Sequence, residues 1–86
     1  MHAVVTSVTI SDQDSTREFL REQLVPRVSS APGFVAGYWV AIAEDKGRGV
    51  IVFESEEAAN AARDQIQPPP GVTMDSIEVG EVVANA

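Results

Sequence analysis

The sequence contains no cysteine, and its single histidine, His2, stands at the amino-terminal end. The absence of cysteine excludes a disulfide framework, a thiolate metal site and a cysteine nucleophile. With one histidine, neither paired imidazoles nor a carboxylate and histidine spacing typical of a metal centre occurs. We therefore expect no metal and no other cofactor, and no motif assigns a catalytic residue.

Basic side chains are also scarce. Six lysines and arginines stand against thirteen aspartates and glutamates, which gives a formal net charge of −7. Nucleic acid binding requires clustered basic side chains to neutralise phosphates, so we expect no nucleic acid partner. No segment reaches the roughly 20 apolar residues of a membrane span, and the first residues lack the pattern of a signal peptide. The sequence predicts a cytoplasmic protein without a membrane partner.

The length and apolar content set the scale of the fold. The 86 residues, 44% of them apolar, predict one domain over residues 1–86 with a real core. A domain of this size buries a modest fraction of its surface, so a second copy would add useful burial.

The order of hydrophobic periods and turn signals predicts β-α-β-β-α-β. Pro26 lies within the first helical pattern, where we expect the helix to kink or to end. We expect a bulge near Gly80 and a helix stop over Pro68–Gly71. The predicted elements are a strand over 3–10, a helix capped by Ser15, a strand over 34–43, a hairpin over 44–49, a strand over 50–53, a helix capped by Ser55 that begins with Glu56 and Glu57 and is alanine-rich over 58–66, and a strand over 72–83.

This order predicts an α+β, ferredoxin-like βαββαβ fold. In that fold a four-stranded antiparallel sheet carries two helices on one face. The sequence shows neither an internal repeat nor a linker that would divide the chain.

The segment FVAGYWVAIA, residues 34–43, is apolar at both strand parities. Strict alternation places Phe34 and Tyr38 on one face and Val35, Trp39 and Ala41 on the other. The helices of so short a chain can cover one face, so the other requires a second copy. We therefore predict a homodimer with Val35, Trp39 and Ala41 at its interface.

The same pattern predicts a ligand cleft. Trp39 has small neighbours on its face, and Ser7 and Thr9 lie on the side of the first strand opposite Val4. Small polar groups in an apolar pocket can orient a ligand, so Ser7, Thr9 and Trp39 are the candidates for the cleft. The alternative is that Trp39 anchors a dimer core and that Ser7 and Thr9 merely suit a strand. His2 has the parity of the helix side, away from this cleft.

Two segments, APGFVAGYW (31–39) and GRGVIVFESEEAANAA (47–62), resemble the dimeric α/β-barrel superfamily, in particular its antibiotic-biosynthesis-monooxygenase-like branch. The resemblance covers essentially the whole chain and implies two ferredoxin-like subunits packed sheet against sheet. Family members include cofactor-independent monooxygenases of aromatic compounds, haem-degrading enzymes and muconolactone-type isomerases. The haem-degrading members use a late histidine, an asparagine and a tryptophan. Here the histidine is His2 and the first strand has no asparagine, so the haem ligands do not carry over.

Three hypotheses for function follow. The first is a homodimeric small-molecule-binding protein with an apolar cleft for a small apolar or aromatic molecule. The second, which rests on the resemblance, is a cofactor-independent monooxygenase acting on an aromatic substrate. The third is a non-catalytic assembly or regulatory module. No residue pattern decides whether the protein is an enzyme.

Overall fold

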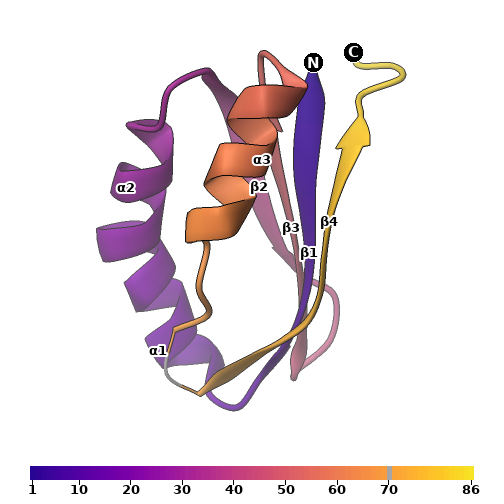
Figure 1. The fold of residues 1–86 in the computed structure, drawn as a ribbon. Helices are drawn as coiled ribbons and strands as arrows, with labels where there is room; N and C mark the ends of the chain where they lie inside the picture. Colours follow the sequence, from indigo (N-terminus) through magenta and orange to yellow (C-terminus); the bar gives the residue numbers. More distant parts are fainter. Residues whose placement is uncertain (70) are drawn as a thin grey trace.

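The computed structural model describes residues 1–69 and 71–86 and has the predicted order of elements. Its four strands form one antiparallel sheet in the order β2-β3-β1-β4, and all helices lie on one face of it (Figure 1). This confirms the ferredoxin-like α+β fold. The elements are β1 (His2–Ile10), α1 (Gln13–Phe19), the π-helical η1 (Leu20–Leu24), α2 (Val25–Ser29), β2 (Phe34–Ala41), β3 (Lys46–Phe53), α3 (Glu56–Gln65) and β4 (Val72–Glu81).

The first helical segment starts earlier than predicted and continues past its proline. Asp12, not Ser15, is the N-cap, because its carboxylate accepts hydrogen bonds from the backbone N–H groups of Asp14 and Ser15. Pro26 lacks an N–H, yet α2 follows directly on the π-helical turn η1. The wider π-helical turn accommodates a residue without an N–H donor, so the helical segment continues past Pro26.

Strand β2 departs from strict alternation at its start. Phe34 pairs with Phe53 and Ala36 with Val52, so Val35 is the extra residue of a β-bulge. A Cβ placed on Gly37 would lie 3.0 Å from the Trp39 ring and 3.6 Å from the Phe34 ring, so these three positions share one face. The prediction that Phe34 and Trp39 point in opposite directions is wrong, because the bulge reverses the parity.

The start of β3 and the position of the bulge in β4 also differ from the predicted ones. β3 begins at Lys46, so Gly47 and Gly49 lie in a strand and not in the hairpin loop. The bulge of β4 falls at Asp75 and not near Gly80, because Ser7 pairs with Ser76 while Val8 pairs with Met74. Within the predicted helix stop over 68–71, Pro70 lies outside the described residues.

The core lies between the helices and the facing side of the sheet. Val4, Ile51 and Phe53 are its largest fully buried side chains, and Ala59 of α3 packs against them. Phe34 meets Phe53 edge to face, with ring centroids 6.2 Å apart. The alanines of α3 allow that helix to lie close to the sheet.

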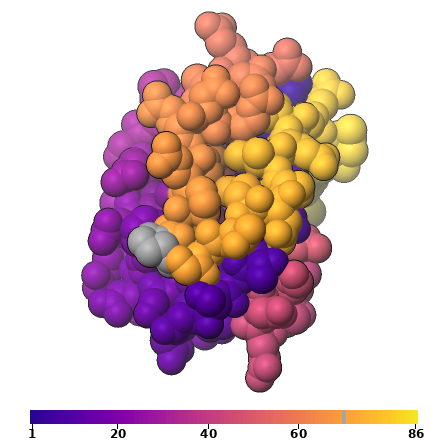
Figure 2. Space-filling view, turned by 60° about the horizontal axis from the view of Figure 1, so that its bottom comes forward, coloured from indigo at the N-terminus to yellow at the C-terminus, as the bar shows by residue number. Residues whose placement is uncertain are grey.

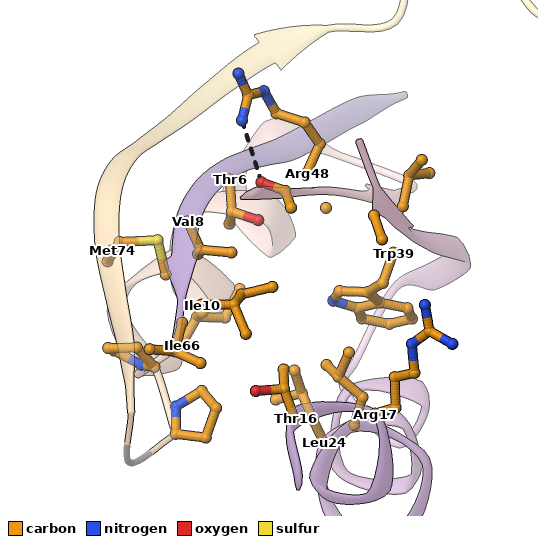
Figure 3. Close-up of a pocket in the computed structure, with 18 of the residues that line it drawn as sticks. Thr6, Val8, Ile10, Thr16, Arg17, Leu24, Trp39, Arg48, Ile66 and Met74 are labelled. Atoms are coloured by element: carbon orange, nitrogen blue, oxygen red, sulfur yellow. Dashed lines mark hydrogen bonds between the residues drawn. The ribbon is translucent and has the colours of Figure 1, made fainter. Parts of the chain in front are cut away.

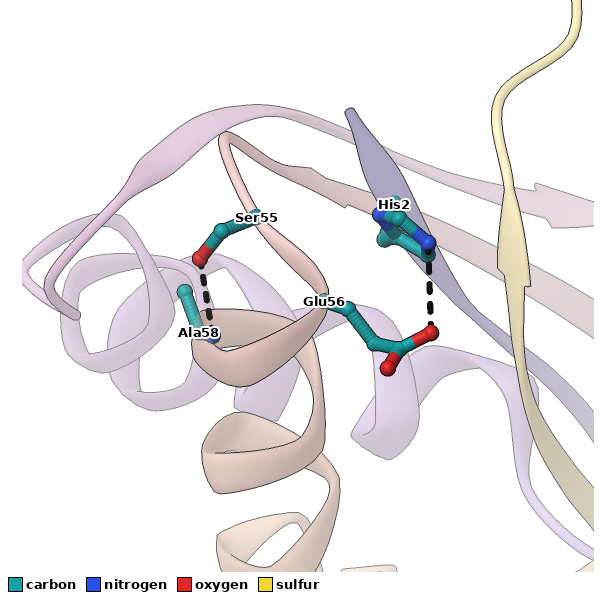
Figure 4. Close-up of polar contacts among 4 residues, drawn as sticks. All are labelled: His2, Ser55, Glu56 and Ala58. Atoms are coloured by element: carbon teal, nitrogen blue, oxygen red, sulfur yellow. Dashed lines mark hydrogen bonds and ion pairs between the residues drawn. The ribbon is translucent and has the colours of Figure 1, made fainter.

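Helix α3 begins where the sequence predicts. The Ser55 hydroxyl accepts a hydrogen bond of 3.1 Å from the Ala58 N–H, and Glu56 follows in the first turn (Figure 4). The Glu56 carboxylate lies 3.4 Å from Nε2 of His2. His2 therefore faces the helix layer, as its parity predicts.

The two ends of the sheet are closed by backbone hydrogen bonds. The Ser11 N–H and hydroxyl both donate to the Gly71 carbonyl, so the turn after β1 and the start of β4 lie side by side at one end (Figure 2). At the other end the Val82 N–H donates to the Met1 carbonyl. Among the described residues, no helix combines the length and apolar character needed to cross a membrane.

The Asp12 cap makes stability depend on pH. Hydrogen bonds from Ser15 and Asp14 lower the pKa of the Asp12 carboxyl below 3.8, with Ser15 the larger cause. A carboxyl whose pKa is lower in the folded state stabilises the protein above its unfolded pKa and loses that contribution as the pH falls through the folded value. We expect Asp12→Asn, which still caps the helix, to weaken the fall in urea midpoint between pH 5 and pH 2.

The matched control is Asp14→Asn, which makes the same chemical change two residues away. Among the described residues, the Asp14 carboxylate accepts no backbone hydrogen bond, so this variant should keep the pH dependence of the parent chain. If Asp12→Asn has the same pH dependence as the parent, the Asp12 cap does not have the assigned role.

Candidate functional site

A cavity of about 220 Å³ lies between the sheet and the helical segment α1–η1. The sheet side is formed mainly by β1 and β3, with contributions from β2 and β4, and the opposite wall comes from α1 and η1 (Figure 3). The residues that characterise the wall are Thr6, Val8, Ile10, Leu24, Trp39 and Met74.

Two glycines of β3, Gly47 and Gly49, line the cavity on the side of the sheet that faces the helices. Gly49 pairs with Thr6 on one side and with Trp39 on the other, and Gly47 lies two residues away on the same face. A Cβ on Gly49 would lie 2.6 Å from the Thr6 Oγ1, closer than side chains approach in real structures. Thr6 and Trp39 therefore occupy the place that a side chain at position 49 would need, and glycine allows both to approach β3 closely.

Two polar atoms face this space across Gly49. Thr6 is 6% exposed, and its side chain points into the cavity opposite the Trp39 indole (Figure 3). A Cβ on Gly49 would lie 3.4 Å from the Trp39 Nε1. Within the described chain, neither the Thr6 hydroxyl nor the Trp39 N–H makes a hydrogen bond. The cavity thus presents two free donors at this point of a wall that is apolar over most of its surface.

The wall holds no group suited to general acid–base catalysis. Among its described residues there is no carboxylate, imidazole, lysine or tyrosine, and its charged residues are Arg17 and Arg48. Figure 3 shows the Arg48 side chain turned away from the cavity, where its guanidinium donates to the Gly47 carbonyl at 3.2 Å. The described residues also hold no cluster of three or more potential metal ligands.

Arg17 stands at the rim of the cavity. It lines both the cavity and a shallower hollow beside the end of β2, and Figure 3 shows its guanidinium near the edge of the Trp39 indole. One helical turn before it, Gln13 donates to the carbonyls of Ala43 and Glu44 at 3.0 and 2.8 Å. Gln13 thereby ties the start of α1 to the loop after β2.

The structure separates the residues predicted for the cleft and the interface. Trp39 and Ala41 line the cavity on the helix side. Ser7 and Thr9 lie on the other face, where Thr9 accepts a hydrogen bond from Lys46 Nζ and donates one to Asp75 Oδ2, both 2.7 Å long. Val35 lies in the bulge, nearly half exposed.

Sequence reasoning missed Thr6 and Gly49 as parts of a site. Thr6 occupies a core position between Val4 and Val8, where an apolar residue is expected, and this departure was a usable signal. The alternation of Gly47 and Gly49 with larger residues indicates a strand face that a ligand or a neighbouring group approaches closely. Because the sequence analysis assigned Gly47 and Gly49 to a hairpin loop, they did not indicate a site on the strand.

Comparison with known proteins agrees on the fold. No protein-family model matches the chain, and no curated protein matches its sequence. Its backbone is that of a ferredoxin-like α+β protein and matches solved structures of MhuD. A substituted form of MhuD with two manganese protoporphyrin IX molecules bound per active site has a TM-score of 0.64 and 20% identity, over 100% of this chain and 98% of that one. The haem-degrader MhuD from Mycobacterium tuberculosis, with two haems bound in its active site, has a TM-score of 0.51 and 24% identity, over 96% and 98%.

Replacing Gly49 tests the close contact of Thr6 and Trp39 across that residue. In Gly49→Ala the new methyl group would overlap the Thr6 hydroxyl and press on Trp39, so we expect a loss of about 1–3 kcal/mol in unfolding free energy. Denaturant titration measures this loss. Gly80→Ala is the control, because that glycine also lies in a strand and has nothing within 4 Å of its Cβ position. Equal effects of the two substitutions would contradict close contact across Gly49.

Proposed function

We propose that the protein binds a small, largely apolar molecule of one or two rings in the cavity beside Trp39, and that it does so as a homodimer. The observation that carries the binding proposal is the cavity itself, apolar on most of its wall and marked by two free donors. Few convergent polar groups in an apolar pocket are typical of small-molecule sites.

The size of the cavity limits the ligand. A cavity of about 150 Å³ holds benzene, whereas pockets for drug-sized molecules start at about 300 Å³. The 220 Å³ found here lies between them, which suits one or two rings.

Haem does not fit this site, although the similar fold of MhuD binds it. The cavity is below the size of a drug pocket, and haem is larger than most drug-sized molecules. His2, the single histidine, is not among the cavity residues and lies against Glu56 instead. No described wall residue offers an imidazole or carboxylate to iron, so we derive no haem chemistry for this chain.

The proposal of a homodimer is supported by the face of the sheet that the helices leave open. We call this the open face: it carries Val5, Tyr38, Val40 and Val50 in neighbouring strand positions. Tyr38 is 66% exposed, and each of the others is more than a third exposed. Contiguous exposed apolar side chains on a strand surface indicate an interaction site, and a second copy offers a matching surface.

Two alternatives fit less well. A pure assembly module would have side chains filling the space beside Trp39, where the structure has a cavity. A cofactor-independent monooxygenase would need the substrate itself to reduce oxygen, and the wall supplies no described base to ionise that substrate. Binding without catalysis is therefore the function that this site supports best.

Trp39 allows a direct binding test because it is the single tryptophan. We expect naphthalene to change the Trp39 fluorescence saturably, because its two rings fit beside the indole. Pyrene, with four rings, should not bind in the cavity, and free N-acetyltryptophanamide controls for collisional quenching. The absence of a saturable response to benzene, indane, naphthalene and indanone alike would refute the binding proposal.

The oligomeric state is tested by a charge on the open face. We expect the parent chain to sediment as a dimer and Val50→Glu as a monomer, because a carboxylate buried between two sheets lacks a partner. Ala61→Glu is the control, since Ala61 is exposed on α3. A monomeric parent chain at micromolar concentration would refute the homodimer.

A further inference from the structure

We propose that the Trp39 N–H and the Thr6 hydroxyl together hold one oxygen of the ligand, so that the cavity selects ring compounds bearing a carbonyl or phenolic oxygen over hydrocarbons. This inference rests on the proposed binding function and specifies its ligand. Thr6 and Trp39 are then the residues that determine specificity.

The geometry places both donors around one point. Thr6, Gly49 and Trp39 form one row across β1, β3 and β2. The Gly49 Cβ position lies 2.6 Å from Thr6 Oγ1 and 3.4 Å from Trp39 Nε1, so these two atoms are at most about 6 Å apart, the sum of the two distances. Donor atoms no farther apart than this can both reach one oxygen at about 3 Å, within the usual range of hydrogen-bond lengths.

The chemistry of the two groups determines what they can bind. An indole N–H is a donor only, whereas a hydroxyl can donate or accept. A ligand atom that contacts the Trp39 N–H must therefore be an acceptor, and Thr6 can donate to the same atom. A hydrocarbon in the cavity would displace water from both donors and leave them unpaired, which is unfavourable.

The choice of Thr6 supports a polar role. Its neighbours along the same face of β1 are Val4 and Val8, and valine has nearly the same shape as threonine. Valine would complete the apolar row at this 94% buried position without an unpaired hydroxyl. The hydroxyl is the one feature that separates Thr6 from its neighbours, and it points into the cavity (Figure 3).

A neutral oxygen suits the pair better than a charged one. The surrounding wall is formed by aliphatic residues such as Val8, Ile10 and Met74. Burying an anion there carries a desolvation cost that two neutral donors do not offset. Arg17, the cation at the rim, lies beyond the Trp39 indole edge in Figure 3 and not beside the pair. We therefore assign the site to a carbonyl or an un-ionised phenol.

The test compares two ligands of one shape. Indanone and indane share a fused two-ring skeleton and differ in the carbonyl oxygen. Calorimetric titration of each into the full chain gives the ratio of their affinities. We expect Thr6→Val and Trp39→Phe each to shift this ratio about tenfold towards indane, the effect of losing one buried hydrogen bond. Comparing ratios cancels the different hydration of the two ligands.

Two controls accompany these variants. Thr6→Ser retains the hydroxyl and should retain the ratio of the parent chain. Thr73→Val makes the same change as Thr6→Val at an exposed position of the opposite face, paired with Thr9, and should leave both affinities unchanged. Circular dichroism melts check that every variant is folded, and Trp39→Phe, at a partly exposed position, gives the result if Thr6→Val fails to fold.

The outcomes separate the two proposals. If neither indanone nor indane binds the parent chain, the proposed function is refuted, and this inference with it. If both bind and the ratio stays the same in Thr6→Val and Trp39→Phe, the cavity binds ring compounds but the donor pair does not select them. That result overturns the inference and leaves the binding function in place.

Discussion

The β-bulge at Val35 determines what each face of this small sheet can do. One extra residue opposite the Phe53–Val52 step reverses the parity of the strand that follows. Trp39 consequently points towards the helices, in line with Phe34, while Tyr38 and Val40 point away. Without the bulge the indole would lie on the open face, and the cavity would lose one wall and one of its two donors.

The two faces of the sheet have different chemistry because of this arrangement. The helix side combines a dense core around Phe53 with a hollow over Gly47 and Gly49. The open face carries exposed valines on β1, β3 and β2 and Tyr38 on the edge strand β2, with the hydrogen-bonded group Thr9, Lys46 and Asp75 at one end. Exposed apolar side chains beside polar ones are typical of protein interfaces, which agrees with the proposed homodimer.

The fold is shared with a haem-binding protein, but the site has a different composition. MhuD was solved with two haems in its active site, whereas the cavity described here is smaller than most drug pockets and offers no described imidazole. A fold accommodates many functions, so the residues around the cavity decide its ligand. The ligand that we propose on the basis of those residues is a small ring compound held by hydrogen bonds.

The order of hydrophobic periods and turns was sufficient to predict the βαββαβ fold, the cap of α3 by Ser55 and the helix-facing parity of His2. These features depend on residues near each other in the chain, whose spacing the sequence displays directly. Pairing between strands decided the rest. The bulges at Val35 and Asp75, the extension of β3 over Gly47 and Gly49, and the meeting of Thr6 with Trp39 all depend on register between distant segments. Register shifts by one residue turn every later side chain to the other face, and local periodicity carries no record of such a shift.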